Sequence, residues 1–600
     1  MDLFRAHVLV CCGTGCTSAQ SLKIIDRMEE ELTASGLNKE VKVVKTGCFG
    51  LCAEGPIMVV YPEGVMYYRV SPDDIREIVT EHLLKGRYVQ RLMTVSTSVP
   101  LDQARNVDES DFFKKQMRIA LRNCGIINPE SIDEYIAHDG YQALAHILTE
   151  KIKPLDVIDQ IKKSGLRGRG GGGFPTGLKW EFAARQMNEQ KYVCCNADEG
   201  DPGAFMDRSI LEGDPHSIVE AMAIAAYAIG ANQGYVYVRA EYPIAVKRLQ
   251  GAIDLARSYG LIGQNIFDTD FSFDIEIRLG AGAFVCGEET ALMRSIEGKR
   301  GNPTPRPPFP AVKGLFGKPT ILNNVETYAN IPVIINKGAD WFAGVGTEKS
   351  KGTKVFALGG KVNNVGLVEI PMGTTVREIV YDIGGGIPAG KAFKAVQTGG
   401  PSGGCIPASL LDVPIDYDNL VAAGSMMGSG GMIVMDEDTC MVDIAKFFLE
   451  FTVEESCGKC APCRIGTRRM LEILEKITSG HGTMDDLDNL ERVALAIREG
   501  SLCALGQTAP NPILSTMKHF REEYIEHVVD KKCRCGVCKG LTTYTIIADL
   551  CKKCGLCAKR CPVNCISGVL GKEPYVIDAS QCIKCGACEQ ACKFKAVVRR

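Results

Sequence analysis

The sequence predicts a multidomain chain of mixed α/β and α+β folds. Its 600 residues are too many for one hydrophobic core, so several domains are expected. Strand-like and helix-like segments alternate through the first half, which predicts α/β architecture there. A repeated cysteine run ends the chain and predicts a separate small α+β domain. The apolar fraction of 45% and the charged fraction of 24% are typical of folded domains.

Composition and charge exclude several classes of protein. The net charge of −3 gives no electrostatic reason to expect a nucleic-acid partner. No apolar stretch has the length that a bilayer span requires, and Met1–Arg5 leads into only a brief apolar run, unlike a signal peptide. We therefore expect a cytoplasmic chain without a direct membrane span. Most of its 27 cysteines are clustered, which in this context indicates metal ligation and not disulfides.

Residues 1–95 predict a small α/β domain of thioredoxin-like type. A strand-like run at His7–Val10 precedes an amphipathic helical stretch at Leu22–Leu32. A second strand follows at Val41–Val44, and the runs at Ile57–Tyr61 and Val65–Tyr68 predict a hairpin about the Pro-Glu-Gly between them.

This first domain carries two pairs of cysteines. Cys11 and Cys16 are separated by four residues, and Cys48 and Cys52 by three, a two-plus-two set that suits a 2Fe–2S cluster. Cys12 is an alternative to Cys11 as the first ligand of this cluster. The Cys-x-x-Cys of a catalytic dithiol is absent from this domain, which argues against thiol–disulfide exchange.

Residues 96–345 comprise a linker at Val95–Val107 and a largely α/β domain with a glycine-rich loop at Gly165–Trp180. Such a loop lets backbone N–H groups approach a phosphate or an isoalloxazine, and Lys179 adds a cation. The polar string Asn196–Gly203 follows a predicted strand, where open α/β sheets bind ligands. The string Gly280–Thr290 combines small residues with two carboxylates suited to ribose hydroxyls. The usual G-x-G-x-x-G of a Rossmann dinucleotide site is missing.

The next two regions differ sharply in pattern. Short β-rich runs with many glycines at residues 346–432 predict a β-grasp module, whereas apolar residues at helical spacing predict a helical bundle at 433–530. In the bundle, Cys457, Cys460 and Cys463 supply three closely spaced thiolates. Cys503, which stands alone between helical stretches, is the expected fourth ligand of a 4Fe–4S cluster, with zinc as the alternative metal.

A Cys-rich connector occupies residues 531–545. Cys533, Cys535 and Cys538 follow His527, so three thiols and one imidazole suit a structural zinc ion. A connector without metal is an equally good interpretation of the same residues. The other isolated thiols are expected to be buried and neutral: Cys124, Cys194, Cys195, Cys286, Cys405, Cys440 and Cys565.

Residues 546–600 carry the most specific pattern in the chain. Two consecutive runs have the spacing C-x2-C-x2-C-x3-C, in which the fourth Cys of each run ligates the cluster of the other. A zinc ribbon would use two pairs of cysteines instead. The sequence therefore predicts a ferredoxin domain with two 4Fe–4S clusters, one held by Cys551, Cys554, Cys557 and Cys592, and the other by Cys582, Cys585, Cys588 and Cys561.

Taken together, these motifs resemble a known family. The glycine-rich loop, the strings Asn196–Glu199 and Gly287–Thr290, and the Cys457 cluster resemble the NADH-binding flavoprotein subunit of respiratory complex I. The first four cysteines are similar to its thioredoxin-like 2Fe–2S partner. With the ferredoxin added, the whole arrangement resembles the diaphorase (beta) subunit of electron-bifurcating, NAD-linked FeFe-hydrogenases.

The resemblance implies a set of cofactor contacts. FMN contacts are implied at Gly168, Arg169, Gly170, Lys179, Asn196, Asp198, Glu199, Gly287, Glu288, Asn323 and Asn324. NAD(H) contacts are implied at Phe174, Phe182, Asp201, Phe284, Glu289 and Phe309. Two departures bear on the choice of nucleotide, because Asp201 stands where complex I has Glu and Arg306 where it has Lys. No side-chain catalyst is expected, since the cofactors carry the chemistry.

The expected function is electron transfer between NAD(H), FMN, three 4Fe–4S clusters and one 2Fe–2S cluster. The expected setting is a hetero-oligomer with a hydrogenase catalytic subunit, a small 2Fe–2S subunit and ferredoxin. A rival within enzymes is the diaphorase subunit of an NAD-linked formate dehydrogenase. A rival from another class is a non-enzymatic Fe–S carrier, which would need the cysteine runs but not the glycine-rich loop.

Overall fold

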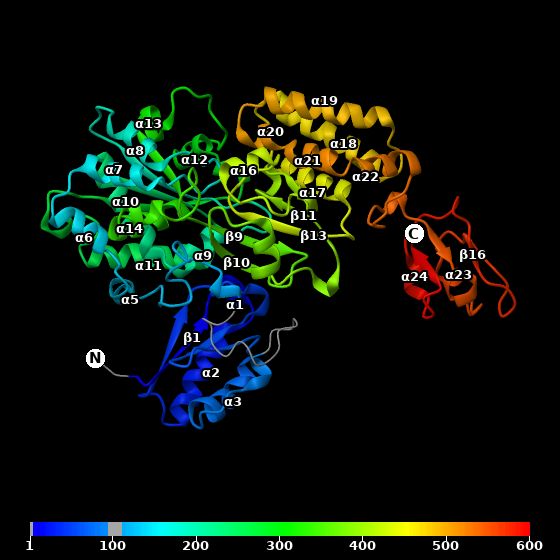
Figure 1. Ribbon diagram of the computed structural model, residues 1–600, viewed down its shortest axis with the longest axis horizontal. Coiled ribbons are helices and arrows are strands. Elements are labelled where there is room, and N and C mark those ends of the chain that lie inside the picture. The colour runs from blue at the N-terminus through cyan, green and yellow to red at the C-terminus, as the bar shows by residue number, and fades with distance from the viewer. Residues whose placement is uncertain (1–3, 94–110, 600) are drawn as a thin grey trace. The chain divides into compact units, whose positions relative to one another are not determined.

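A computed structural model describes residues 4–93 and 111–599 (Figure 1). The chain forms two compact units, Met1–Met435 and Asp436–Arg600, and each is described by itself. We call them the N-terminal and the C-terminal unit. The expected linker at Val95–Val107 lies outside the described residues. Within the described residues, no helix combines the length and the apolar character that crossing a bilayer requires.

The N-terminal unit begins with a four-stranded sheet in the order β2-β1-β3-β4. Strand β1 (Ala6–Cys11) runs parallel to β2 (Val41–Thr46) and antiparallel to β3 (Met58–Tyr61), which pairs with β4 (Val65–Tyr67). Helix α2 (Ser21–Ala34) buries its apolar face against this sheet. The predicted strand, helix, strand and hairpin therefore all form.

A second, fully parallel sheet follows in the order β7-β6-β5-β8. Its strands are β5 (Tyr192–Ala197), β6 (Gln233–Arg239), β7 (Asp274–Gly280) and β8 (Thr320–Asn324). Helices cover both faces, as the alternating pattern predicts (Figure 1). Because the chain moves outward from β5 to β7 and then returns to place β8 on the other side of β5, the strand order reverses between β5 and β8. In open α/β sheets, such a reversal is where ligands bind.

Helices α10 and α14 form the core against this parallel sheet. Helix α10 (Pro215–Ile229) is apolar almost all round and is buried along nearly its whole length. Helix α14 (Val325–Lys337) follows β8 directly, and the Asn324 side chain caps its first turn. The carboxyl end of β8 is thereby fixed at the point where the strand order reverses.

The last sheet of the N-terminal unit has five strands in the order β10-β9-β13-β11-β12. Strand β9 (Thr353–Gly360) is antiparallel to β10 (Gly366–Pro371) and parallel to β13 (Gly431–Asp436). Strands β11 (Phe393–Thr398) and β12 (Cys405–Pro407) form an antiparallel pair at the other edge. The short glycine-rich runs thus form the small β module that was predicted.

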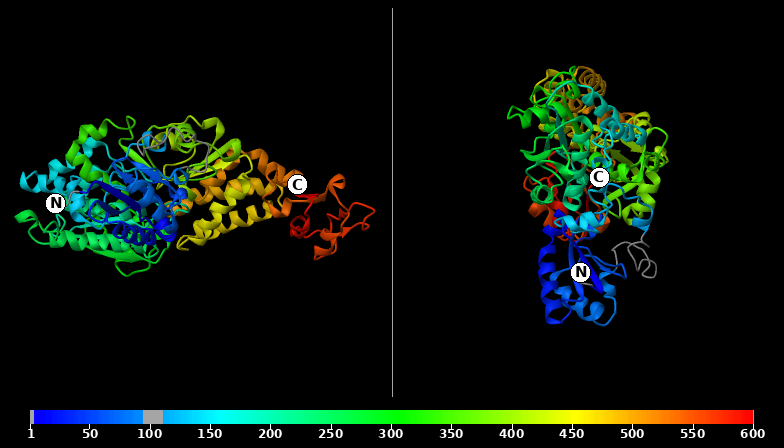
Figure 2. Two further views of the ribbon diagram at one scale, coloured as in Figure 1. Left: turned by 90° about the horizontal axis from the view of Figure 1, so that it is seen from below. Right: turned by 90° about the vertical axis from the view of Figure 1, so that its left-hand side faces the viewer.

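Helices make up most of the C-terminal unit. The long helices α17 (Met441–Glu454), α18 (Thr467–Thr478) and α19 (Met484–Gly500) pack side by side around one apolar core (Figures 1 and 2). The amphipathic stripes predicted from the sequence face this core. Short helices α20 (Ala504–Thr508), α21 (Asn511–His519) and α22 (Arg521–Ile525) complete the bundle.

The chain ends in a domain built twice from the same pattern. The strand pairs are β14 (Tyr544–Ile546) with β17 (Val597–Arg599), and β15 (Ile566–Ser567) with β16 (Val576–Ile577). Each half contributes one short helix, α23 (Leu556–Arg560) or α24 (Ala587–Ala591), and the two pack together. This domain has its own small core, which includes cysteines from both halves.

Candidate functional site

The polar strings predicted from the sequence meet where the strand order reverses. Asn196 of β5 lies opposite Asn324 of β8 in the ladder, so both side chains stand at the carboxyl ends of adjacent strands. The Asn196 amide donates a 2.8 Å hydrogen bond to the carbonyl of Gly287. The string around Gly287 is thereby joined to the string that follows β5.

The glycine-rich loop folds back on itself beside these strand ends. The Gly168 N–H donates a 2.8 Å hydrogen bond to the Phe174 carbonyl, and the Tyr417 hydroxyl donates to the Gly168 carbonyl at 2.7 Å. Gly173 has a φ of +62°, and a Cβ there would lie 2.6 Å from the Tyr417 ring. A Cβ on Gly170 would lie 3.1 Å from that of Asn324. A side chain at Gly173 would be strained and would collide with Tyr417, and one at Gly170 would crowd Asn324, so glycines here let backbone N–H groups approach a flat ring or a phosphate.

Buried carboxylates line the carboxyl end of β5. Glu199 accepts hydrogen bonds from the backbone N–H groups of Asp207 and Arg208, and the amide of Asn324 donates to Asp207 at 2.6 Å. Burial raises the pKa of Glu199 and raises that of Asp207 further, with the Glu199 charge adding to the second effect. Asp198 beside them is also buried. The arrangement favours orientation of a polar ligand by carboxylates that are themselves held in place.

Asp201 connects this end of the sheet to the β module. Its carboxylate accepts a hydrogen bond from the Ser429 hydroxyl, and a Cβ on Gly400 would lie 3.0 Å from its carboxyl carbon. Burial raises the pKa of Asp201 to about 6, while the Ser429 hydroxyl lowers it. A carboxyl group with this pKa changes its charge close to neutral pH.

Two cations flank Glu289 at the start of helix α12 (Glu289–Ile296). The Arg306 guanidinium donates to its carboxylate, and the Lys179 ammonium lies 3.8 Å from the other oxygen. Burial lowers the pKa of Lys179, and the Glu289 charge raises it. The neighbouring Glu288 caps the helix through bonds from the N–H groups of Thr290 and Ala291. Glu288 is therefore held by the helix, while Glu289 remains within reach of cations.

The aromatic residues predicted for nucleotide binding fall into two groups. Phe174, Phe182 and Phe309 are large exposed apolar side chains with 46%, 41% and 57% of their surface accessible. The Arg306 guanidinium lies 5.9 Å from the centre of the Phe309 ring. Phe284 instead packs closely against Gly200, where a Cβ would lie 2.6 Å from its ring. Exposed rings, one of them beside the Arg306 cation, suit stacking against a base.

The side chain of Arg169 is held by the backbone around the glycine-rich loop. Its side chain is fully buried, and its guanidinium donates to the carbonyls of Arg167, Lys351 and Thr353 at 2.6–2.9 Å. Its backbone N–H donates to the Thr327 hydroxyl. The side chain therefore ties the glycine-rich loop to the start of β9. Asn323 is also engaged, because its amide oxygen accepts a 3.0 Å hydrogen bond from Trp180.

Four thiols of the first domain come together as expected. The Cys48 and Cys52 sulfurs lie 3.4 Å apart, and Cys11 interacts with Cys16 and Cys48. Cys12, the competing first ligand, faces the Ser21 hydroxyl 4.0 Å away and is not part of this group. The donor set of four converging thiols fits a 2Fe–2S cluster.

A second thiol group lies in the helical bundle. Cys463 lies in the π-helical turn Pro462–Gly466 that precedes helix α18, and charge interactions link it to Cys457, Cys460 and Cys503. Burial raises the pKa of Cys463 to about 11, while the Ser456 hydroxyl 3.2 Å away lowers it. Helix α20, which begins just after Cys503, packs against the turn that holds Cys463. The isolated Cys503 thus joins the three clustered thiols, and this set fits a 4Fe–4S cluster.

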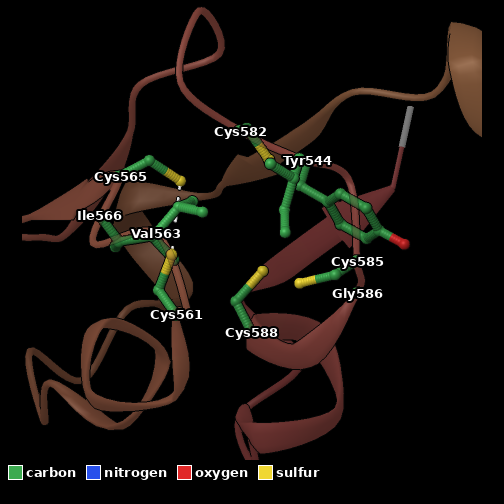
Figure 3. Close-up of a pocket in the computed structure, with 10 residues that line it drawn as sticks. Tyr544, Cys561, Val563, Cys565, Ile566, Cys582, Cys585, Gly586 and Cys588 are labelled. Atoms are coloured by element: carbon green, nitrogen blue, oxygen red, sulfur yellow. Dashed lines mark hydrogen bonds between the residues drawn. The ribbon is translucent and has the colours of Figure 1, made fainter.

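Two cavities lie in the C-terminal domain, residues 546–600 of the C-terminal unit. Each is lined by three cysteines of one run and the fourth cysteine of the other run. The first is lined by three cysteines of the first run and one of the second, namely Cys551, Cys554, Cys557 and Cys592. The second is lined by three cysteines of the second run and one of the first, namely Cys582, Cys585, Cys588 and Cys561 (Figure 3). Most of the other lining side chains are apolar, but the first wall also includes Lys552 and the second also includes the Cys565 thiol. The two cavities fit two 4Fe–4S clusters in the arrangement that the spacing predicts.

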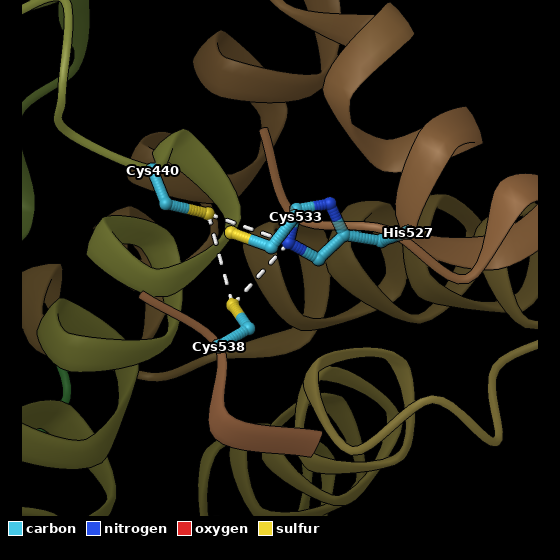
Figure 4. Close-up of side chains that lie close together, drawn as sticks. All are labelled: Cys440, His527, Cys533 and Cys538. Atoms are coloured by element: carbon cyan, nitrogen blue, oxygen red, sulfur yellow. Dashed lines mark hydrogen bonds between the residues drawn. The ribbon is translucent and has the colours of Figure 1, made fainter. Parts of the chain in front are cut away.

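One more group of side chains has the composition of a metal site, and its members differ from the predicted set by one residue. Cys440, His527, Cys533 and Cys538 are all buried, with ligand atoms within 4.8 Å of one another (Figure 4). Cys440, expected to be an isolated neutral thiol, takes the place predicted for Cys535. The Cys535 sulfur instead contacts the Glu437 carbonyl at 3.7 Å. Nothing in the sequence spacing connects Cys440 to His527, which is 87 residues away.

The imidazole of this group is oriented by the backbone. His527 Nδ1 lies 2.7 Å from the Glu523 carbonyl, so the ring proton sits on Nδ1. Nε2 then faces the sulfurs of Cys440 and Cys538, at 3.4 and 3.3 Å, with its lone pair available. Three thiols and one such imidazole are the donor set of a closed tetrahedral zinc site.

Four protein-family models match separate parts of the chain. They are described as thioredoxin-like [2Fe-2S] ferredoxin at residues 3–83, Nuo51 FMN-binding domain at 161–333, NADH-ubiquinone oxidoreductase-F iron-sulfur binding region at 443–527, and 4Fe-4S dicluster domain at 543–593. They confirm the predicted fold class and the presence of domains for FMN, a 2Fe–2S cluster and 4Fe–4S clusters.

Curated relatives cover most of the chain. It is 64% identical to the NADP-reducing hydrogenase subunit HndC of Solidesulfovibrio fructosivorans, over 81% of this chain and 99% of the relative. It is 46% identical to the F 2 subunit of the NADH-quinone oxidoreductase of Rhizobium meliloti, over 69% and 98%. A crystal structure of an NAD+-reducing [NiFe]-hydrogenase matches 88% of this chain and 85% of its own, with 29% identity and a TM-score of 0.61. The chain therefore belongs to the family of FMN- and iron–sulphur-containing NAD(H) oxidoreductase subunits that includes HndC and the F subunits of NADH-quinone oxidoreductases.

Proposed function

We propose that this chain moves electrons between NAD(H) and one 2Fe–2S and three 4Fe–4S clusters by way of FMN. One observation carries the proposal: the glycine-rich loop and the acidic strings meet where the strand order reverses between β5 and β8. Bound there, FMN supplies the exchange between two-electron transfer with the nicotinamide and one-electron transfer with the clusters.

The residues of this site have distinct roles in the proposal. Gly168 and Gly170 leave room for the flavin, while Asn196 and Asn324 orient polar groups at the strand ends. Phe174, Phe182 and Phe309 offer exposed rings for the nucleotide. We omit the Arg169 side chain from the flavin contacts because three carbonyl oxygens already occupy it.

Cofactor content tests the proposal directly. Ligand counting predicts about fourteen iron atoms per chain in anaerobically prepared protein, together with one FMN. Flavin with much less iron would contradict the cluster assignments. Iron without flavin would instead support the non-enzymatic carrier.

The choice of nucleotide is a separate part of the proposal. Glu289 is placed to repel a 2′-phosphate, so we propose that NAD(H) is preferred over NADP(H). The ion pair with Arg306 offsets part of this charge, so the preference is expected to be modest. Glu289→Gln should raise the rate of dye reduction with NADPH relative to NADH. Equal rates with both nucleotides in the unaltered protein would contradict the role of Glu289.

We further propose a structural zinc ion at Cys440, His527, Cys533 and Cys538. The expected content is about one zinc per chain. Cys440→Ala should remove the zinc and lower the melting temperature. Cys535→Ala is the matched control and should retain both. If Cys535→Ala lost the zinc and Cys440→Ala kept it, the zinc ligand would be Cys535 and not Cys440.

The partners are proposed from the relatives. Because two relatives are named as hydrogenase subunits or hydrogenases, we propose a hetero-oligomer with a hydrogenase catalytic subunit and a small 2Fe–2S subunit. The cluster sites lie in separate domains, which suits electron transfer from the flavin to two different acceptors. Electron bifurcation with ferredoxin requires two such acceptors. Co-purification from the native host tests the partner. A formate dehydrogenase in the purified complex would favour the alternative.

A further inference from the structure

The second cavity of the C-terminal domain contains more thiols than one cluster needs. Besides Cys561, Cys582, Cys585 and Cys588, its wall includes Cys565 (Figure 3). The Cys565 side chain is 5% exposed, and the sequence predicted only a neutral buried thiol there. Five thiols therefore surround a space that a four-ligand cluster would occupy.

The extra thiol lies next to one particular ligand. The sulfurs of Cys561 and Cys565 are 3.5 Å apart, in contact across one turn of the chain. Cys582 is also close enough to interact with the Cys565 thiol. In Figure 3 the Cys561 and Cys565 side chains extend toward each other. The two sulfurs are thus in contact, so both thiols lie beside the same corner of the cavity.

The internal repeat supplies a comparison within the same domain. Cys592 is the counterpart of Cys561, and four residues later Ala596 is the counterpart of Cys565. The backbones match, because Asn564 and Lys595, which precede these two residues, have φ values of +53° and +51°. Ala596 lines the first cavity as Cys565 lines the second. The two positions thus differ in one respect, the presence of a thiol.

We propose that Cys565 is a reserve ligand of the second cluster and replaces Cys561 at the same iron. This rests on the proposed cluster assignments. In the exchange, the iron–sulfur bond to Cys561 breaks and one to Cys565 forms. The proton of the Cys565 thiol passes to the released Cys561 thiolate, so oxidation states and net charge are unchanged.

The arrangement protects the more accessible of the two ligands. Cys561 is partly exposed, whereas Cys565 is buried. Oxidants that modify a surface thiolate reach Cys561 first. A buried thiol in contact with it keeps four sulfur ligands available to the cluster. Among the described residues, the first cavity has no such reserve, because Ala596 stands at the equivalent position.

Iron content of full-chain variants tests the proposal. Cys561→Ala should keep the iron of the unaltered protein, and Cys561→Ala/Cys565→Ala should lose up to four of about fourteen iron atoms. The matched control is the other half of the repeat: Cys592→Ala should lose iron, and Cys592→Ala/Ala596→Cys should regain it. If the alanine variant does not fold, Cys561→Val gives the same comparison with a side chain of more similar size that offers no ligand atom.

Spectra of the reduced proteins identify which cluster is affected. The Cys561→Ala protein should retain the electron paramagnetic resonance signals of two interacting 4Fe–4S clusters, with an altered line shape from the new ligand. The proposal is overturned if Cys561→Ala loses as much iron and signal as the double variant. If the unaltered protein itself lacks this pair of clusters, the cluster assignment fails instead.

Discussion

The first and the last cluster sites of the chain use the same ligand chemistry in opposite surroundings. Cys11 and Cys48 of the N-terminal site are 1% and 8% exposed. In the C-terminal domain, Cys554 and Cys585 are exposed. A ligand thiol at the surface leaves a short path for electrons to an outside partner, whereas a buried one does not.

Contacts around the N-terminal thiols explain the difference. The Thr14 N–H donates a 2.9 Å hydrogen bond to the Glu212 carboxylate, and the Leu367 N–H donates to the Gly50 carbonyl at 2.7 Å. The Arg118 guanidinium donates to the Phe49 carbonyl at 2.6 Å. The loops that carry the cysteines are thus bonded to distant parts of the N-terminal unit. We infer that this cluster exchanges electrons within the chain and that the C-terminal domain serves an external acceptor.

Deleting residues 546–600 should have the largest effect and would test this division of roles. NADH-driven dye reduction should persist, because the flavin site lies wholly in the N-terminal unit. Transfer to the physiological low-potential acceptor should be lost, with about eight iron atoms per chain. Both assays are run on the purified complex. If dye reduction were lost as well, residues 546–600 would be required for every electron-transfer reaction of the chain and would not form a separate branch.

Gly47→Val should break the docking of the first domain. A Cβ on Gly47 would lie 2.3 Å from the Gly213 Cα, so a larger residue must displace the backbone. Overpacking of this kind costs about 1–3 kcal/mol. Faster proteolysis of the first domain and a lower melting temperature are expected. Gly15→Ala, where the added Cβ meets nothing within 4 Å, is the control and should leave both unchanged.

Burial in the N-terminal unit should also appear in the pH dependence of stability. Burial raises the pKa of Asp201 to about 6, above the unfolded value of about 3.9. The folded protein therefore binds this proton more tightly, so Asp201 destabilises it as pH rises from about 4 to about 6. The difference is on the order of 1–3 kcal/mol. Asp201→Asn should lack this dependence in thermal melts at several pH values; identical curves would refute the effect of burial.

The smallest expected effect is electrostatic. Glu212→Gln removes a charge beside the loop that carries Cys11 and Cys16 while keeping an acceptor for the Thr14 N–H. The midpoint potential of the 2Fe–2S cluster should rise by tens of millivolts, because reduction adds negative charge. Redox titration followed by paramagnetic resonance measures this shift. Glu30→Gln, at an exposed carboxylate, is the control. An unchanged potential would mean that Glu212 acts only in packing.

Sequence spacing was most informative where ligands are close in the chain. The spacing of the ferredoxin runs predicted both groups of cysteines, because short loops fix the directions of the thiols. It also predicted that Cys561 joins the cysteines of the second run and Cys592 those of the first. Cys503 was identified as an isolated residue between helical stretches. Cys440 was missed because only tertiary packing brings it to His527. Local spacing contains no information about such a pair.

The direction of a side chain was also beyond what the sequence could predict. The family resemblance implied a flavin contact at Arg169 but not the direction of its side chain, and its guanidinium donates to the carbonyls of Lys351 and Thr353. The strand order β7-β6-β5-β8 also had to come from the structure, since alternating strands and helices are compatible with several orders. The sequence therefore did not show that the polar ends of β5 and β8 are neighbours in the sheet.

The central claim is that electrons enter this chain from NADH through FMN and continue to its clusters. The most direct measurement is the anaerobic addition of NADH to the purified chain, with and without its flavin, followed by optical and paramagnetic resonance spectra. With FMN present, the flavin band should bleach and reduced iron–sulphur signals should appear. Without FMN, the clusters should stay oxidised. Cluster reduction that proceeds equally well without FMN, or a flavin that NADH leaves oxidised, would contradict the account.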